Sequence, residues 1–314
     1  MAKDSEPKVA IIILTYSQDK LLDSCIDSIE DKTDYKNYKI FVIDNNSEKK
    51  IGDKIKKKFP KVRVVINDKN YGFSKGNNIG MDIARREYDP DYFLILNDDT
   101  ETVQENWLKK LIKIYDREKN LGILGCKLIY PDGKFQSVGG FVRGWQINLL
   151  KNLDKDQLIE VDHIMGAFML IQRSAMDKLN GFDEDFSPYL LEDTDLCLRA
   201  KKLGFSVKSF EGVEFIHRAH QSFKSSRDKK LFFRFKNDII FSWRHLALKD
   251  FFIRVFLYLP GVAMFKKESD ESELHFGNFE FRKSFIRSLF YLLGAYFFVL
   301  FGGRGVKNGK PKKM

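Results

Sequence analysis

The first half of the chain alternates between apolar runs of strand length and segments in which apolar residues recur at helical spacing. The strand-like runs lie at 9–14, 39–43, 62–66 and 92–96. The helical patterns lie at 21–29, 51–59, 79–83 and 107–115, the second ended by Pro60 and the third capped by Ser74. Continuous apolar strands separated by amphipathic helices are typical of a parallel sheet covered on both faces. The pattern therefore predicts a doubly wound α/β fold.

The middle of the chain is less regular. Gly122 to Ile129 and Asp162 to Ile171 have the composition of strands, the second containing Gly166. Residues 130–133 form a turn by composition. A short helix is expected from Glu192 to Leu203, because Gly204 is a stop signal. Two short strands are expected at 207–210 and 213–216.

The character of the chain changes after about residue 222, where aromatic and charged residues interleave. Two apolar stretches follow. Phe251 to Phe265 is interrupted by Arg254 and by Pro260-Gly261, and Leu289 to Gly303 carries no charge. We place a domain boundary near residue 225, so that 1–225 form an α/β domain and 226–314 a helical extension.

The composition of the chain limits the classes of partner that it is expected to bind. The 314 residues are 43% hydrophobic, and the formal net charge of +10 lies mostly in the C-terminal part. Such a charge favours nucleic acid, an anionic membrane or anionic substrates. Three cysteines without CxxC spacing are expected to be buried apolar residues in a reducing compartment. The apolar run from Val9 to Leu14 is too short for a signal peptide.

Polar residues follow each of the four predicted strands. They are Thr15, Tyr16 and Ser17; Asp44, Asn45 and Asn46; Asn67, Asp68 and Asn70; and Asn97, Asp98 and Asp99. Any one group could be an Asx turn. Four groups at one edge of a parallel sheet predict a polar crevice suited to a nucleotide. Carboxylates at this edge suit Mg²⁺ or Mn²⁺, which usually keep substrate phosphates among their ligands.

Further residues extend this prediction. The segment 70–78, which includes Gly76 and Asn77, is a loop entering a helix, and its N–H groups could meet a pyrophosphate; a plain capping turn is the alternative. No dinucleotide or P-loop motif is present. His217 follows an apolar strand and is a candidate ligand for the Asp99 metal, with His220 as its nearest rival and a structural role as the alternative.

A second acidic group lies at Glu192 and Asp193, at a predicted helix start where the dipole favours acids. Asp195 and Arg199 are spaced as an i, i+4 helix pair, so we assign Asp195 a structural role. Capping of this helix could account for one of the two acids.

The order of these motifs resembles the family 2 glycosyltransferases, particularly the rhamnosyltransferase-like branch. The resemblance covers about residues 8 to 222. It rests on 13–16, 42–47, 70–80, 96–100, 166–171, 181–184, 192–199, and His217 with Ser222. Each piece alone is weak, whereas their combination and order are specific.

The resemblance implies a GT-A fold, Rossmann-like with a mostly parallel sheet. It also implies a nucleotide-sugar donor, a divalent ion (Mn²⁺ or Mg²⁺) and inversion at the anomeric carbon. Asn97-Asp98-Asp99 stands at the Asp-x-Asp motif, with Asp99 the metal ligand. His217 would bind the metal or diphosphate. Asp44 would contact the base or ribose, and Asp193, following Glu192, would be the general base.

The implied donor-binding set comprises Thr15, Tyr16, Asp44, Asn46, Asn70, Gly76, Asn77, Asn97 and Asp98. The donor half would span about 1–100 and the acceptor half about 101–225. Three departures from the family pattern occur: Ser17 replaces a frequent Asn, Asn97 replaces the first acid, and Ser187-Pro188 replaces an aromatic position, which bears on acceptor identity.

Two other functions have specific sequence requirements. A sugar-phosphate nucleotidyltransferase would need a Gly-rich, basic loop after the first strand, where residues 15–19 provide none. A nucleic-acid-binding protein would need one basic face on a recognition fold, yet the excess charge lies beside long apolar runs. We therefore expect no nucleic-acid partner.

The C-terminal extension is expected to hold the enzyme on the inner, cytoplasmic face of an anionic membrane, near a glycan or lipid-linked glycan acceptor. Spanning takes about 20 apolar residues. Leu289 to Gly303 falls short of that unless Arg287 and Arg304 extend to the interfaces, and Pro260-Gly261 breaks the other stretch. Packing on the catalytic domain or a homo-oligomer interface is the alternative.

Overall fold

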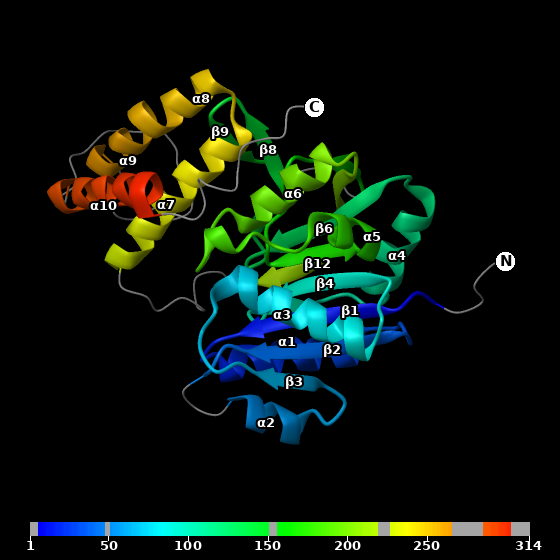
Figure 1. The fold of residues 1–314 in the computed structure, drawn as a ribbon. Coiled ribbons are helices and arrows are strands. Elements are labelled where there is room, and N and C mark those ends of the chain that lie inside the picture. Colours follow the sequence, from blue (N-terminus) through cyan, green and yellow to red (C-terminus); the bar gives the residue numbers. More distant parts are fainter. Residues whose placement is uncertain (1–5, 48–50, 151–155, 219–226, 266–284, 303–314) are drawn as a thin grey trace. The chain divides into compact units, whose positions relative to one another are not determined.

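The computed structural model describes residues 6–47, 51–150, 156–218, 227–265 and 285–302, so His220 and Ser222 lie outside the described residues. Two compact units are present (Figure 1). The first comprises Met1–Phe141, Asn148–Pro188 and Glu192–Lys224, and the second comprises Val142–Ile147, Tyr189–Leu191 and Ser225–Met314.

The first unit is built on a central, mostly parallel sheet. Its strands run in the order β10-β12-β6-β11-β4-β1-β2-β3. The parallel part comprises β3 (Arg63–Ile66), β2 (Tyr38–Asp44), β1 (Val9–Thr15) and β4 (Tyr92–Asn97). These are the four strands predicted from the apolar runs, and the doubly wound α/β fold is confirmed.

The other half of the sheet mixes directions. Strand β11 (Phe168–Gln172) is antiparallel to β4 and to β6 (Leu121–Ile129), and β6 is parallel to β12 (Ser206–His217). Three short strands pair with these: β10 (Leu158–Glu160), β5 (Thr100–Thr102) and β7 (Phe135–Ser137). A hairpin of β8 (Gly140–Arg143) and β9 (Gln146–Leu149) forms a separate sheet.

Helices cover both faces of the sheet, as Figure 1 shows for α3 and α1 on opposite sides of β1. One face packs on α1 (Asp19–Lys32), α2 (Ile51–Lys58) and α4 (Trp107–Arg117). The other packs on α3 (Gly72–Glu87), α5 (Arg173–Leu179) and α6 (Glu192–Lys202). Ile11 and Ile13 face the first set, whereas Ala10 and Ile12 face the second, so β1 is buried on both sides.

Three local predictions for this unit were wrong. Helix α3 begins at Gly72, whose φ of 77° turns the chain into the helix, so Ser74 lies inside the helix and does not cap it. Gly166 lies before β11, which begins at Phe168. Its N–H bonds to the Asp193 side chain and not to a neighbouring strand. The two short strands at 207–216 are one strand, β12, with an irregular register between Phe210 and Glu214.

The second unit is helical. It contains α7 (Arg227–His245), α8 (Leu248–Phe252), the π-helical η2 (Ile253–Tyr258), α9 (Leu259–Phe265), α10 (Phe285–Phe297) and the π-helical η3 (Phe298–Gly302). Pro260-Gly261 does not break the helical run, because both residues lie within α9, directly after η2. No helix in the described ranges is both long and apolar enough to cross a membrane.

Arg254 interrupts the apolar stretch of this unit without being exposed. Its side chain and that of Asp238 are each 3% exposed, and the guanidinium donates to the Asp238 carboxylate, with Nε at 3.0 Å. The guanidinium also donates to the carbonyl of Trp145. A charge in an apolar core is tolerated only with such a partner, so α7 and η2 are joined by a buried ion pair.

Candidate functional site

The acidic end of β4 meets the end of β12. Thr100 of β5 pairs with His217 of β12, which brings the Asp99 carboxylate to 3.4 Å from His217 Nε2. Both side chains are buried, and the backbone carbonyl of Asp99 accepts a hydrogen bond from Arg218 N at 2.9 Å. The antiparallel pairing of β5 and β12 therefore joins two residues that are far apart in the sequence.

Gln136 sets the orientation of the imidazole. Its Oε1 lies 2.9 Å from His217 Nδ1. Because a carboxamide oxygen can only accept, Nδ1 carries the proton. In the neutral imidazole the lone pair of Nε2 is then directed toward the Asp99 carboxylate, and a cation between the two acceptors would offset their repulsion.

This donor set fits a divalent ion that keeps open positions. A carboxylate oxygen and an imidazole nitrogen are suitable ligands for Mn²⁺, and Mg²⁺ also uses one or two protein carboxylates with substrate phosphates. Among the described residues there is no group of three or more His, Cys, Asp or Glu that could hold a metal. Asp99 and His217 supply two ligands, so an ion held by them would need further ligands from a phosphate-bearing substrate or water.

The second acidic group lies at the start of α6. Asp193 Oδ2 accepts from Gly166 N at 2.8 Å, and Oδ1 accepts from Thr194 N at 2.6 Å. Glu192 beside it is buried. A Cβ at Gly166 would lie 3.1 Å from Phe73 Cζ and 3.5 Å from Asp193 Cβ, so a side chain there would crowd the phenyl ring.

A short run of backbone connects the two acidic groups. Gly166 holds Asp193, and the carbonyl of the next residue, Ala167, accepts from Asn97 N at 3.1 Å. Asn97 directly precedes Asp98 and Asp99, which are both buried. The Asp193 carboxylate and the Asp99–His217 pair therefore lie at the same end of β4.

Asp44 lies at the carboxyl end of β2 with its carboxylate turned into the following loop. Oδ1 accepts from Ser47 N at 2.8 Å and from Ser47 Oγ at 2.5 Å, and Oδ2 accepts from Gly52 N at 3.0 Å. The side chain is 1% exposed. The carboxylate therefore binds Ser47, which follows β2, and Gly52 in the first turn of α2.

A network of carboxamides joins the ends of β2 and β3. Asn45 Oδ1 accepts from Asn67 Nδ2 at 2.8 Å, and Asn45 Nδ2 donates to Asn70 Oδ1 at 3.3 Å. Asn70 Oδ1 also accepts from Gly72 N at 2.9 Å, whereas Asn46 donates to the Asp68 carbonyl at 3.1 Å. Asn45 is therefore the centre of this network, although the implied donor-binding set included only its neighbour Asn46.

Several buried polar atoms near the end of β1 and in the first turns of α3 have no hydrogen-bond partner among the described residues. They are Thr15 Oγ1, Ser17 Oγ, Ser74 Oγ and Asn77 Oδ1. Leaving such atoms unpaired costs about 1–3 kcal/mol each. Their presence at the end of β1 and in the first turns of α3 suits a site that a polar ligand completes.

Two other predicted donor-side residues play different parts. A Cβ at Gly76 would lie 2.5 Å from Leu14 Cδ1 and 3.2 Å from Asn45 Nδ2, so Gly76 permits α3 to pack closely on β1. Tyr16 is exposed, directly after β1. Its ring is therefore available to a ligand, whereas Gly76 acts through packing.

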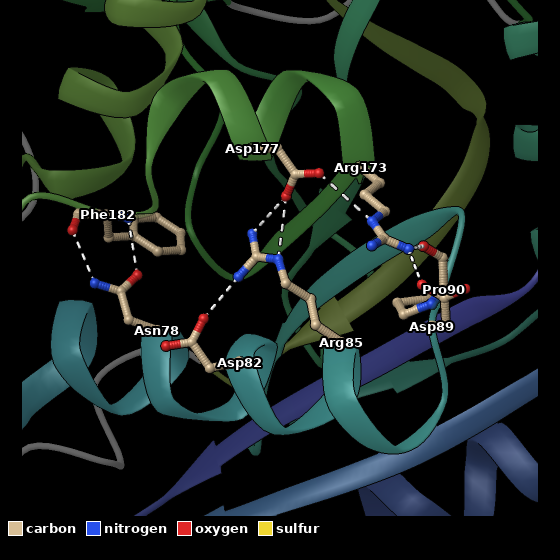
Figure 2. A network of polar contacts seen from close by, with 8 residues as sticks. All are labelled: Asn78, Asp82, Arg85, Asp89, Pro90, Arg173, Asp177 and Phe182. Atoms are coloured by element: carbon tan, nitrogen blue, oxygen red, sulfur yellow. Dashed lines mark hydrogen bonds and ion pairs between the residues drawn. The ribbon is translucent and has the colours of Figure 1, made fainter.

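Polar contacts fix α3 to the segment around α5 (Figure 2). Asn78 Nδ2 donates to the Phe182 carbonyl and Asn78 Oδ1 accepts from Phe182 N, both at 2.9 Å. Farther along α3, Arg85 bonds to Asp82 at 2.8 Å and to Asp177 at 3.0 Å. These contacts hold the first turns of α3, which carry the predicted donor-binding residues Gly76 and Asn77, in place.

Arg199 of α6 holds the end of α5 and the residues that follow it. Its Nε donates to Asp195 Oδ2 at 2.7 Å, which confirms the predicted i, i+4 pair. Its other nitrogens donate to the carbonyls of Leu179 and Gly181. Asp195 is fully buried and acts as a structural anchor.

His163 is a neighbour of Asp193 that sequence reasoning missed. It is buried, and a Cβ at Gly140 would lie 2.6 Å from its Nε2. Burial lowers the pKa of His163, while the Asp193 carboxylate and a hydrogen bond with the Asn148 carbonyl act in the opposite direction. Its position three residues before Gly166 was the signal that could have drawn attention to it.

The three cysteines are buried and free, as expected. Burial raises the pKa of the Cys25 and Cys197 thiols, so neither is poised as a nucleophile.

Comparison with known families gives two matches. The family described as "Glycosyl transferase family 2" matches residues 10–179. The model described as "N-terminal domain of galactosyltransferase" matches residues 152–222. Together they cover the segments that carry Asp99, Asp193 and His217.

Curated relatives are distant in sequence. The uncharacterised protein y4gI of Sinorhizobium fredii is 25% identical, over 79% of this chain and 28% of its own length. Rhamnosyltransferase WbbL of Escherichia coli K12 is 26% identical, over 77% of this chain and 93% of its own. The N-acetylglucosaminyl-diphospho-decaprenol L-rhamnosyltransferase of Mycobacterium tuberculosis is 23% identical, over 69% and 78%. The chain thus spans about a quarter of the first of these.

Solved structures share the fold. GalNAc-T7, crystallised with UDP, GalNAc and Mn²⁺, superposes with a TM-score of 0.63 at 16% identity, over 81% of this chain and 51% of its own. The mannosyltransferase PcManGT of Pyrobaculum calidifontis, in complex with GDP-Man and Mn²⁺, gives 0.53 at 13% identity, over 96% and 79%. The first unit therefore has the GT-A type of α/β fold.

Proposed function

We propose, because this chain belongs to glycosyl transferase family 2, that it transfers a sugar from a nucleoside-diphosphate donor to a hydroxyl group of a glycan acceptor. The observation that carries the proposal is the pair of acidic groups at the end of β4. Asp99 lies 3.4 Å from His217, and Asp193 is held by Gly166 on the adjacent backbone.

Asp99 and His217 would hold Mn²⁺ or Mg²⁺. When bound, such an ion neutralises negative charge on the diphosphate leaving group. Gln136 fixes the His217 ring so that Nε2 faces this position. The unpaired polar atoms of Thr15, Ser74 and Asn77 support a donor bound along β1 and the first turns of α3.

Asp193 is the proposed general base. As the acceptor oxygen attacks the anomeric carbon, Asp193 takes the proton of that hydroxyl. The new C–O bond forms while the bond to the diphosphate breaks, and the nucleoside diphosphate leaves. Attack from the face opposite the leaving group inverts the anomeric configuration. Glu192 lies beside the base and is buried, so we assign it a supporting role.

The donor is proposed to be a UDP- or dTDP-sugar, with rhamnose as the first sugar to test, since two relatives are named rhamnosyltransferases. The acceptor is proposed to be a growing polysaccharide on a lipid carrier, because one of these names includes a diphospho-decaprenol acceptor. Such an acceptor would place the enzyme at the inner face of a membrane.

A donor screen tests the proposal. Purified full-length protein is incubated with UDP-, dTDP- and GDP-sugars and Mn²⁺, and release of nucleoside diphosphate is measured. We expect turnover of one donor that is lost in Asp99→Asn. A folded protein that turns over none of them, with or without added glycan acceptor, would contradict the proposed activity.

A further inference from the structure

Helix α10 and η3 are apolar around nearly their whole circumference. One stripe is buried and consists of Ser288, Leu292, Ala295 and Val299. Within the second unit α10 packs against α7 and α9.

The opposite stripe is exposed. It consists of Ile286, Phe290, Leu293, Phe297 and Leu300, at intervals of four, three, four and three residues, which is the spacing of one helix face. Phe290 is 74% exposed and Leu300 is 71% exposed. A stripe of this kind needs a partner less polar than water.

The exposed apolar surface continues onto η2. Phe256 stacks on Tyr296 of α10 with ring centroids 6.0 Å apart, and on Phe252 with centroids 5.5 Å apart. Leu257 is 70% exposed. We call this surface the aromatic face. Its members are Phe252, Phe256, Leu257, Ile286, Phe290, Leu293, Phe297, Leu300 and Phe301.

The first unit has no comparable surface among its described residues. Its exposed large apolar side chains are Tyr16, Ile66, Val103, Leu149 and Leu203, which lie on separate elements. Exposed apolar residues scattered in this way are ordinary on a soluble surface. The aromatic face is therefore a property of the helical unit.

The positive charge of residues 226–314 favours an anionic partner for the aromatic face. Residues 226–314 contain 18 Lys or Arg and eight Asp or Glu, a formal net charge of +10 that equals the charge of the whole chain. Lys249 of α8 and Arg287 of α10 are exposed, and they lie within three residues of Phe252 and Ile286 in the sequence. A second copy would present the same positive charge, whereas an anionic bilayer offers an apolar interior beneath negative headgroups.

We propose that the aromatic face docks on an anionic lipid bilayer, with α10 and η2 lying in the headgroup region. Phenyl and leucyl side chains would enter the acyl boundary, and the basic side chains would meet the phosphates. This inference deepens the proposed function by supplying the lipid surface at which a lipid-linked acceptor is met. Docking itself requires no sugar transfer, so the two can fail separately.

Vesicle co-sedimentation of the full chain tests the docking. We expect binding to vesicles of phosphatidylglycerol and phosphatidylcholine, and weak binding to phosphatidylcholine alone. The triple variant Phe290→Ser/Phe297→Ser/Phe301→Ser should bind the anionic vesicles at least about tenfold more weakly. The reason is that each Phe side chain that leaves water for the bilayer adds favourable free energy to binding. Val103→Ser/Leu149→Ser/Leu203→Ser, in the first unit, is the matched control and should bind like the wild type.

The charges are tested separately. Lys249→Gln/Arg287→Gln should weaken binding to anionic vesicles by roughly fivefold per charge at low salt, and the difference should shrink as salt is added. Equal binding of the wild type to anionic and neutral vesicles would overturn the proposal.

Two further results would also overturn the docking. One is undiminished binding of the triple aromatic variant. The other is a lipid-free dimer, seen by sedimentation velocity, that only this variant loses, because a second copy would then be the partner. Release of nucleoside diphosphate from a soluble donor is measured in parallel. Binding without turnover would refute the proposed activity alone, and turnover without binding would refute the docking alone.

Discussion

Asp99 and His217 are two buried side chains whose facing atoms are both acceptors when the imidazole is neutral. If they hold a divalent ion, Asp99→Asn should abolish transfer, and EDTA should do the same to the wild type.

The role of His217 is tested by calorimetry with a nucleoside diphosphate. His217→Ala should bind the nucleoside diphosphate about tenfold or more weakly when Mn²⁺ is present, and with little change when it is absent. Full activity in EDTA, or an unchanged affinity in His217→Ala with only stability lost, would assign the pair a structural role.

Asp193 accepts Gly166 N on Oδ2 and Thr194 N on Oδ1, so the single oxygen of an asparagine can keep only one of these bonds. We expect Asp193→Asn to fold with a lower Tm than the wild type and to lower kcat by about 10²–10⁴-fold, because the amide cannot take the acceptor proton. Donor affinity, measured without acceptor, should stay near the wild-type value. A parallel collapse of donor affinity would show that Asp193 binds the nucleotide or supports the fold.

At the scale of elements, α3 is held by Asn78, which makes paired hydrogen bonds with the backbone of Phe182. Asn78→Ala should lower the free energy of unfolding by about 1–3 kcal/mol, since both partners are partly buried and would lose a bond. Lys75→Ala on the same helix is the control. Its ion pair with Glu184 is exposed, at 3.6 Å, and should contribute about 1 kcal/mol or less. Equal losses for the two variants in urea denaturation would contradict this role of Asn78.

At the scale of the whole molecule, three stretches of the chain form the second unit, including Tyr189–Leu191. Asn237 of α7 donates to the carbonyls of Tyr189 at 2.7 Å and Leu190 at 2.9 Å. Leu190 and Leu191 have φ of 83° and 69°, which is unfavourable for residues other than glycine and needs support from the surroundings. Glu192 and Asp193 follow directly.

We therefore expect a chain that ends at residue 225 to lose stability and activity in addition to the proposed membrane attachment. Without Asn237, the segment before Asp193 loses the bonds that support its backbone, so we expect a lower Tm and a loss of transfer. Asn237→Ala in the full chain should reproduce part of the loss of kcat while leaving vesicle binding intact. A shortened chain with wild-type Tm and donor turnover would show that the C-terminal part serves only for attachment.

Local patterns were sufficient for the four parallel strands, their covering helices and the acidic end of β4, because burial on both sides of a strand and on one face of a helix leaves a periodic record in the sequence. The resemblance to family 2 selected Asp99, Asp193 and His217 as candidates by the order of motifs. The position of Gly166 outside β11, the beginning of α3 at Gly72 and the continuity of β12 depended on contacts that no local pattern records.

The sequence by itself determined the α/β class, the polar edge of the sheet and the concentration of positive charge beyond residue 225. Only the tertiary structure decided that Thr100 pairs with His217, that Asn45 is the centre of the carboxamide network, and that Arg254 is neutralised by Asp238. The physical reason is range. Propensity and amphipathic period are set by neighbours along the chain, whereas these pairings depend on strand register and helix packing, which bring together residues that are distant in the sequence.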